Sequence, residues 1–473
     1  MTTDFLIDST DAAGPAPCDL WLVGQPALEE WLAGQDVAVR VWLGATGFKA
    51  ERQHLALLPG PGGTIRGAVL GLGSPGSFDS LEPWHVAGLP ERLPAGTRWR
   101  LAGQALAPEA AATVVLGWAY GSYRFESYKS AATARPGDAR PRLLAPAGAS
   151  LVPMLRIAAA TAWARDLVNT PAADMNPARL AEEARRLAQT CGASIEEVSG
   201  EALRTGFPAI HAVGQASAVA PRLLDLRWGD PSRPKLTLIG KGVCFDTGGL
   251  DLKPATGMAL MKKDMGGAAC ALALSRLVME SGLPVRLRVL IPAVENAVSG
   301  NAYRPGDVIR TRKGLTVEVG NTDAEGRLIL CDALALADEE APDLLVDLAT
   351  LTGAARVALG PELPALFGKR PATVEALLGH GRRVADPLWQ MPLWAGYEDD
   401  IASKVADVNN VSASTFAGAI IGALFLQRFV TLTTDWMHVD LFAWNPRERP
   451  GRPVGAEPQA VRALFALLTE RYG

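Results

Sequence analysis

The sequence predicts an α/β protein of two domains, each a mixed sheet flanked by helices. Short apolar runs that are typical of buried strands alternate with helical patterns over most of the 473 residues. Chains that alternate in this way form sheets covered by helices. Residues 131–149, rich in Ala, Pro and Arg, have the composition of a linker or an edge segment. We therefore expect an N-terminal α/β domain at residues 1–150 and a larger domain at residues 151–473.

The N-terminal domain is expected to contain four strands and three helices in its first 125 residues. The last of these helices has Pro108 in its first turn, where the fixed φ of proline suits a helix. The predicted strands cover residues 20–23, 37–43, 55–58 and 68–72, and the predicted helices cover residues 27–32, 81–89 and 108–119.

Residues 71–76 of this domain fit the G-x-G-x-x-G pattern of dinucleotide sites. Such a site needs a helix that begins at the glycines, so that the helix N-terminus meets the pyrophosphate. Pro75 is badly placed for that purpose, and the next helix is expected only near Leu81. We interpret the stretch as a loop between a strand and a helix.

The larger domain repeats the alternation of strands and helices. One helix is expected to begin at Pro177, because Asn176 is a good capping residue and proline suits the first turn. The predicted strands cover residues 223–228, 236–239, 287–291, 316–319 and 344–348, and further helices are expected at 154–168, 265–280, 328–338, 417–430 and about 457–472.

The composition is that of an ordinary globular enzyme, with 48% apolar and 20% charged residues. A net charge of −4 gives no overall basic field, which argues against nucleic acid or an anionic membrane as a partner. The N-terminus has no secretory signal pattern, and the longest apolar stretch, Ala417 to Leu426, is too short to span a bilayer. We therefore expect a cytoplasmic protein without a membrane segment.

Cysteine and histidine usage limits the kind of metal site that is possible. The five cysteines are scattered and form no C-x-x-C motif, as in proteins with reduced thiols. The five histidines include no pair at i, i+4 spacing, which argues against a zinc site built on histidines. A metal site in this chain would therefore depend mainly on oxygen ligands.

Charged side chains that could bind a metal ion or take part in catalysis are concentrated in residues 321–328, Asn-Thr-Asp-Ala-Glu-Gly-Arg-Leu. If the segment is extended, Asp323, Glu325 and Arg327 point the same way, since alternate residues share a face. Gly326 would let the backbone approach a neighbouring group closely. Taken alone, two carboxylates at this spacing more often belong to a solvated turn than to a metal site.

A second stretch changes that interpretation. Residues 240–254 and 261–269 place four charged side chains in Gly-rich turns beside predicted strand or helix ends. In such sheets, sites lie at the carboxyl ends of the strands. The four residues are Lys241, Asp246, Lys253 and Asp264.

Together the two stretches resemble the leucyl aminopeptidase (cytosol aminopeptidase) family. The match to N-T-D-A-E-G-R-L is complete, and the pattern G-K-G-x-x-F-D-(S/T)-G-G…K-P…D-M-G-G-A-A is met throughout. The resemblance extends from about residue 120 to the C-terminus. It implies a two-metal aminopeptidase that releases N-terminal amino acids from peptides by attack of a metal-bridged water, as a cytoplasmic homohexamer.

The resemblance also implies the metal ligands. Two divalent ions per subunit are expected, Mn or Zn, with Mg or Co as alternatives. Asp246 and Glu325 would be shared by the two ions, and Lys241 would have to lose its proton to act as a ligand. The full ligand set would be Lys241, Asp246, Asp264, Asp323 and Glu325.

The same resemblance assigns roles in catalysis and substrate binding. Lys253 would stabilise the oxyanion, and Arg327 would bind a bicarbonate that acts as the general base. The substrate side chain would contact Met261, Thr350 and Gly353. The family usually has a small residue where this chain has Phe442. The phenyl group would therefore reshape the pocket, unless it only packs in the core beside Trp444.

Two other functions remain possible at this point. A DNA-binding or architectural protein with secondary peptidase activity would need a basic stripe, and the pI near 5.9 argues against one. A two-metal phosphohydrolase would use similar ions, but the sequence contains no loop suited to cradle a phosphate.

Overall fold

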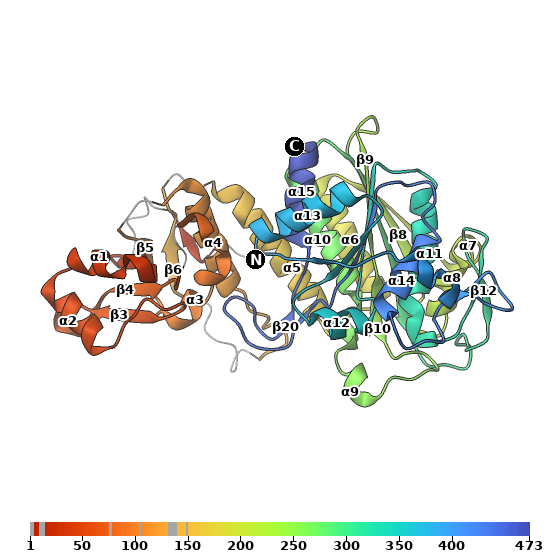
Figure 1. Ribbon diagram of the computed structural model, residues 1–473, viewed down its shortest axis with the longest axis horizontal. Helices are drawn as coiled ribbons and strands as arrows, with labels where there is room; N and C mark the ends of the chain where they lie inside the picture. The colour runs from red at the N-terminus through yellow and green to blue at the C-terminus, as the bar shows by residue number, and fades with distance from the viewer. Residues whose placement is uncertain (1–3, 9–14, 75–77, 104–105, 131–139, 148–149) are drawn as a thin grey trace. The chain divides into compact units, whose positions relative to one another are not determined.

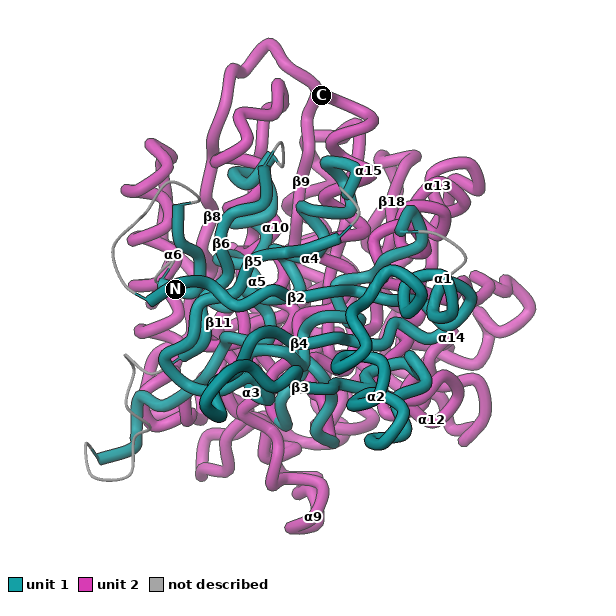
Figure 2. The backbone as a smooth tube through the Cα atoms, turned by 90° about the vertical axis from the view of Figure 1, so that its left-hand side faces the viewer, with its two compact units in different colours: residues 1–162, 447–454 teal, residues 163–446, 455–473 magenta. Residues whose placement is uncertain are grey.

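The computed structural model describes residues 4–8, 15–74, 78–103, 106–130, 140–147 and 150–473. The chain divides into two compact units, residues 1–162 with 447–454 and residues 163–446 with 455–473 (Figures 1 and 2). The division falls within helix α5 (Leu151–Asn169). Each unit contains a mixed sheet with helices, which confirms the predicted α/β fold.

The first unit is built on a six-stranded sheet in the order β1-β6-β5-β2-β4-β3. All neighbouring strands are parallel except β3 and β4, which are antiparallel. The strands are β1 (Leu6–Ile7), β2 (Cys18–Val23), β3 (Leu55–Pro59), β4 (Ile65–Gly71), β5 (Arg98–Leu101) and β6 (Arg142–Leu144), and the helices are α1 (Leu28–Ala33), α2 (Val37–Ala45), α3 (Leu89–Arg92) and α4 (Pro108–Gly121).

The strand predicted at residues 37–43 is wrong, because these residues form α2. The side chain of Asp36 caps the helix by accepting a hydrogen bond of 2.8 Å from Val39 N. Val39 and Leu43, four residues apart, are buried, whereas Val37 is 64% exposed. The alternation of valines suggested a strand, but the capped N-terminus and the burial at i, i+4 spacing favour a helix.

Two further predictions in this unit need correction. Instead of a helix over residues 81–89, the chain forms a short 3-10 turn at Pro83–His85, and α3 then begins at Leu89. Part of the expected linker forms β6, which lies between β1 and β5 and is therefore not at the sheet edge. Two other parts of that segment, residues 131–139 and 148–149, lie outside the described residues. The same holds for Pro75 and Gly76 of the glycine-rich loop.

The second unit contains a nine-stranded sheet in the order β16-β15-β18-β14-β9-β11-β8-β7, with β10 paired to β11. Its centre, β18-β14-β9-β11, is parallel, and β8 pairs antiparallel with β11. The strands are β7 (Ser194–Ser199), β8 (Arg222–Trp228), β9 (Lys235–Gly240), β10 (Gly242–Asp246), β11 (Arg286–Asn296), β14 (Leu344–Ala349), β15 (Ala365–Gly368), β16 (Trp389–Gln390) and β18 (Trp436–Asp440).

Helices cover both faces of this sheet (Figure 1). On one face, α6 and α10 contact the strands, and α15 packs on α10. On the other, α8 and α11 contact the strands, and α14 packs on α11. The helices are α6 (Pro177–Cys191), α7 (Gly200–Gly206), α8 (Pro208–Gly214), α9 (Ala255–Met258), α10 (Gly266–Glu280), α11 (Glu325–Asp338), α12 (Gly353–Leu359), α13 (Pro371–Arg383), α14 (Gly418–Gln427) and α15 (Val461–Tyr472).

Small sheets complete this unit. β12 (Val308–Arg310) and β13 (Thr316–Glu318) form an antiparallel pair, and β17 (Val408–Asn409) pairs with β13. β19 (Trp444–Asn445) pairs with β20 (Gly455–Ala456). Among the described residues, no helix combines the length and the apolar character that crossing a bilayer requires.

Candidate active site

Several strands of the larger sheet end at one edge. In the register of the sheet, Gly240 of β9 lies opposite Leu348 of β14, and Ala349 of β14 lies opposite Asp440 of β18. The residues that follow these ends, among them Lys241 and Thr350, therefore lie beside one another. This is the edge at which α/β sheets usually bind their ligands.

Asp246 is the last residue of β10, and its side chain is held from two sides. Its Oδ1 accepts hydrogen bonds from Gly248 N at 2.9 Å and from Asn296 Nδ2 at 2.8 Å. Gly248 has φ of +88°, and a Cβ at this position would lie 3.0 Å from Asp323 Oδ1 and 2.5 Å from Asp251 O. Glycine is therefore required for the turn that brings Asp246 near Asp323.

Asp264 lies in the 3-10 turn η6 (Met261–Met265), directly before α10. Thr350 Oγ1 donates a hydrogen bond of 2.8 Å to Asp264 Oδ1. Asp264 is 3% exposed and Lys241 is also 3% exposed, so the charge of each requires a partner.

The segment around Asp323 is not extended, and the prediction that rested on an extended chain is wrong. Asp323 lies in the 3-10 turn η7 (Thr322–Ala324), and Glu325 begins α11. Asn321 Oδ1 accepts a hydrogen bond from Asp323 N at 2.7 Å and so starts the turn. Because the backbone is helical from here on, Arg327 does not follow the direction of the two carboxylates; its Nη1 donates to Asn410 O.

Two lysines each pair with two carboxylates. Lys241 Nζ lies 2.7 Å from Asp264 Oδ2 and 2.8 Å from Glu325 Oε1. Lys253 Nζ lies 2.8 Å from Asp246 Oδ2 and forms a second ion pair with Asp323. A Cβ on residue 326 would lie 2.8 Å from Lys241 Nζ, so a glycine at that position makes room for the ammonium group.

The carboxylates fit a divalent metal ion. Asp246, Asp323 and Glu325 can each offer one oxygen such that all three atoms lie within 4.8 Å of one another. Within the described part of the chain, Asp264 Oδ2, Asp323 Oδ1 and Glu325 Oε1 are buried and receive no hydrogen bond of good geometry, although lysine ammonium groups lie at ion-pair distance. Clustered oxygen ligands of this kind suit hard or borderline divalent cations.

The electrostatics of the carboxylate cluster also favour the binding of a divalent metal ion. Burial, and then the neighbouring charge of Asp246, raise the pKa of Glu325 to about 8. Burial disfavours the charge of Lys241, but Asp264, Glu325 and Asp246 outweigh this effect and raise its pKa. The cluster thus holds more negative charge than the two lysines compensate, and added positive charge would relieve the repulsion.

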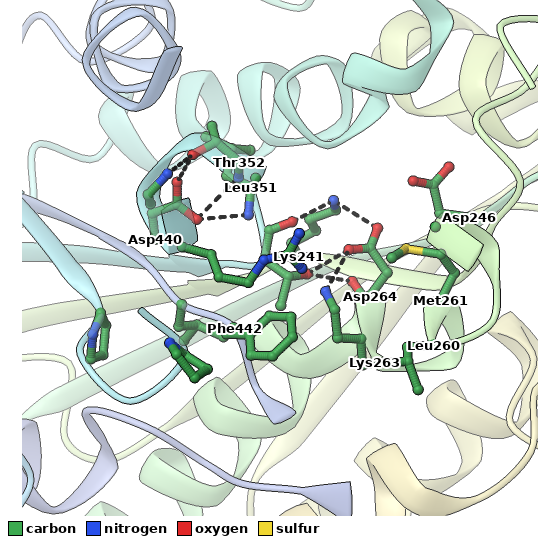
Figure 3. A pocket seen from close by; sticks show the side chains of 18 of the residues that line it. Lys241, Asp246, Leu260, Met261, Lys263, Asp264, Leu351, Thr352, Asp440 and Phe442 are labelled. Carbon is green, nitrogen blue, oxygen red and sulfur yellow. Dashed lines mark hydrogen bonds and ion pairs between the residues drawn. The ribbon is translucent and has the colours of Figure 1, made fainter. Parts of the chain in front are cut away.

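The predicted site residues meet in one cavity of about 360 Å³ (Figure 3). Arg327 is the exception among them, since it does not line this cavity. The cavity is lined by Lys241, Asp246, Lys253, Met261, Asp264, Asp323, Glu325, Thr350, Gly353 and Phe442, together with residues that the sequence did not single out.

Three of these additional residues are Lys263, Arg356 and Gln459. Lys263 is next to Asp264 in the sequence, and this adjacency was the only signal that could have drawn attention to it. Burial lowers the pKa of Lys263 to about 8. Arg356 of α12 and Gln459 belong to no recognised motif, so only the fold brings them to the site.

A cavity lined by a carboxylate cluster at the edge of a mixed sheet is typical of metal-dependent α/β enzymes. Residues 162–465 match the model of the cytosol aminopeptidase family, catalytic domain, and residues 18–137 match that of the M17 aminopeptidase, N-terminal domain. The chain therefore belongs to the cytosol aminopeptidase family and is a metallo-aminopeptidase.

Individual relatives agree with this assignment. A probable cytosol aminopeptidase of Syntrophotalea carbinolica is 39% identical over 462 residues, which cover 92% of this chain and 91% of that protein. The crystal structure of the cytosol aminopeptidase from Coxiella burnetii has a TM-score of 0.92 at 42% identity, covering 99% of this chain and 100% of that chain. The bottromycin maturation enzyme BotP, solved in complex with Mn, has a TM-score of 0.85 at 33% identity, covering 97% of this chain and 100% of that chain.

These relatives confirm the predicted family and the predicted aminopeptidase activity. Nothing in them supports the alternative of a DNA-binding or architectural protein.

Proposed function

We propose that the domain at residues 151–473 releases N-terminal residues from peptides with the help of two divalent ions. The carboxylate cluster, in which Asp246, Asp323 and Glu325 can each offer an oxygen within 4.8 Å of the others, is the observation that carries this proposal. The ions would be held by Lys241, Asp246, Asp264, Asp323 and Glu325.

The proposed ligands would bind the ions in different ways. As the family resemblance implies, Asp246 and Glu325 would each contribute to holding both ions. Lys241, now protonated between Asp264 and Glu325, would lose its proton and turn its lone pair to an ion. When bound, the two ions would polarise the scissile carbonyl and lower the pKa of a water molecule.

Lys253 is proposed to stabilise the oxyanion that forms at the scissile carbonyl. Its side chain lines the cavity, and its ammonium group is held by Asp246 and Asp323. Burial opposes its charge, but Asp246 outweighs this effect and raises the pKa of Lys253, so the group is a cation at neutral pH. A fixed cation in a largely buried site stabilises developing negative charge without reorganisation.

Although Arg327 does not line the cavity, the family resemblance supports the proposal that it binds a bicarbonate, which would accept a proton during the reaction. Its side chain is 9% exposed, and its Nε is buried without a hydrogen-bond partner among the described residues. A planar guanidinium with a free N–H suits a small planar anion. The anion would thus accept a hydrogen bond from Arg327 Nε, which has no partner among the described residues.

The substrate side chain is proposed to contact Met261, Thr350, Gly353 and Phe442, all of which line the cavity. Phe442 is only partly buried, as expected for a wall of the cavity. Its phenyl group takes volume that a smaller residue would leave to the substrate. Loss of room for one methylene changes discrimination by roughly 1–3 kcal/mol.

The metal, the assembly and the location are proposed by analogy. Mn or Zn is favoured, with Mg or Co as alternatives, because the ligands are mostly oxygens and the related BotP was solved with Mn. We also propose a cytoplasmic homohexamer, and the location is supported by relatives that carry the name cytosol aminopeptidase.

One experiment tests the proposed function directly. Hydrolysis of leucyl and alanyl anilides is measured for protein loaded with Mn or Zn and for protein treated with a chelator. An N-terminally acetylated substrate serves as the control for the need for a free amine. Hydrolysis that persists without metal, or that is equal for the acetylated substrate, would contradict the proposal.

A further inference from the structure

Two cations lie beside the ring of Phe442 in the wall of the cavity. Lys263 Nζ is 5.1 Å from the ring centroid, and Arg356 Cζ is 4.8 Å from it. All three side chains line the cavity, and Figure 3 shows the side chain of Lys263 next to the ring of Phe442. The quadrupole of the ring attracts both cations but offers neither of them a negative charge.

Neither cation has a close counter-ion of its own. The carboxylate oxygen that approaches Lys263 Nζ is Asp264 Oδ1, at 3.9 Å, and it already accepts a hydrogen bond from Thr350 Oγ1. The other oxygen of Asp264 pairs with Lys241. In the described part of the chain, Arg356 forms no ion pair within 4.0 Å, and its side chain is exposed.

The negative groups of the cavity are engaged elsewhere. Two of the four carboxylates of the cluster pair with Lys241 and two with Lys253. The remaining carboxylate, Asp440, accepts hydrogen bonds from Leu351 N, Thr352 N and Thr352 Oγ1. The carboxylates of the cavity therefore have closer partners than Lys263 and Arg356.

The position of this wall is fixed by the fold. Gln459 Oε1 accepts hydrogen bonds from Phe442 N at 2.9 Å and Ala443 N at 3.0 Å, and Gln459 Nε2 donates to Pro361 O at 3.0 Å. The backbone that carries the phenyl ring is thereby tied to the opposite loop. These hydrogen bonds fix the backbone from which the ring of Phe442 projects.

We propose that Lys263 and Arg356 form a subsite for a side-chain carboxylate, so that the enzyme prefers peptides with N-terminal Glu or Asp over those with Gln, Asn, Lys or Arg. This inference rests on the proposed function, because it places the substrate side chain in this cavity. A carboxylate would supply the missing counter-ion and accept charge-assisted hydrogen bonds from both cations. A substrate ammonium or guanidinium would add a third cation to the same wall and be repelled.

The test compares substrates that differ only in charge. We expect kcat/KM for Glu anilide to exceed that for Gln anilide by at least about tenfold, the scale of one hydrogen bond to a charged group. Lys263→Met should reduce this ratio by about tenfold, and Arg356→Met should reduce it to a smaller degree because this side chain is exposed. Lys262→Met is the matched control, since Lys262 Nζ donates to Asn169 O and does not line the cavity.

A binding measurement separates this inference from the proposed function. Calorimetric titration of metal-loaded protein with free glutamate and glutamine requires no turnover, and glutamate should bind at least about tenfold more tightly. A Glu to Gln ratio of one or less in both experiments, or a ratio that Lys262→Met lowers as much as Lys263→Met does, would overturn the inference. Loss of all anilide hydrolysis with preserved preference for glutamate would contradict the proposed function alone.

Discussion

Asp323 is the most accessible of the four carboxylates in the cluster, since its side chain is 34% exposed whereas those of Asp246, Asp264 and Glu325 are nearly buried. Asp323→Ala should therefore remove a metal ligand without loss of fold. We expect bound metal to fall from about two ions per chain to about one, and kcat/KM to fall at least roughly 100-fold, because a metal Lewis acid contributes several kcal/mol. Metal analysis and anilide kinetics measure both effects.

The control for this prediction is Glu375→Ala, which removes an exposed carboxylate of α13 far along the sequence from the motifs. It should leave the metal content and the rate unchanged. Full activity of Asp323→Ala would contradict the two-metal assignment.

Lys253 offers a second prediction at the level of single residues. Its ammonium group is proposed to act on the transition state, so Lys253→Ala should lower kcat by roughly 10²-fold or more and change KM little. Steady-state kinetics on leucyl anilide tests this, with the exposed Lys404→Ala as the control. An unchanged kcat together with a raised KM would show that Lys253 binds substrate but does not assist the reaction.

At the level of elements, the C-terminal end of α11 is joined to the loop that precedes β18. Asp338 accepts hydrogen bonds from Thr431 N at 2.7 Å, Leu432 N at 2.9 Å and Thr433 N at 2.7 Å. Burial alone would raise the pKa of Asp338, but these hydrogen bonds outweigh it, and the pKa lies below its usual value. The charged carboxylate therefore stabilises the fold by holding the loop against the helix.

Asp338→Asn should lower the free energy of unfolding by roughly 1–3 kcal/mol at neutral pH, because buried N–H groups lose a charged acceptor. A lowered pKa in the folded state means that this stabilisation is complete above the unfolded pKa of about 4 and is lost as the pH falls through the folded pKa. Urea denaturation over that range should show the difference between the two proteins shrinking on acidification. Glu339→Gln, at an exposed neighbouring position, should cost less; equal stability of Asp338→Asn and wild type at neutral pH would refute the argument.

At the level of the whole molecule, the two compact units should respond differently to metal. All proposed ligands lie in the second unit, so bound ions should raise the Tm of that unit alone. Ion at about 100 times its Kd contributes about 2.7 kcal/mol per site, which corresponds to a rise of several degrees. Calorimetry of metal-loaded and chelator-treated protein checks this, and a Tm that is independent of metal would contradict ion binding to the folded site.

The sequence by itself determined those features that depend on local chemistry. Asn176 accepts hydrogen bonds from Ala178 N and Arg179 N and begins α6, as its residue type predicted. The apolar runs of the larger domain form the predicted strands, because a strand covered on both faces has to be apolar. The motifs named the four carboxylates and the two lysines that pair with them in the cavity, because a carboxylate cluster requires particular side chains wherever the fold places them.

Only the tertiary structure decided what depends on contacts between distant parts of the chain. The valines of α2 alternate as in a strand, and only the packing of Val39 and Leu43 in the core of the first unit shows which side of a helix they occupy. The direction of Arg327 follows from the helical start of α11, which no pattern of alternate residues shows. Lys263 and Arg356 meet at the ring of Phe442 because the turn η6, the helix α12 and the residues after β18 lie together. No local segment contains these contacts, which join residues far apart in the sequence.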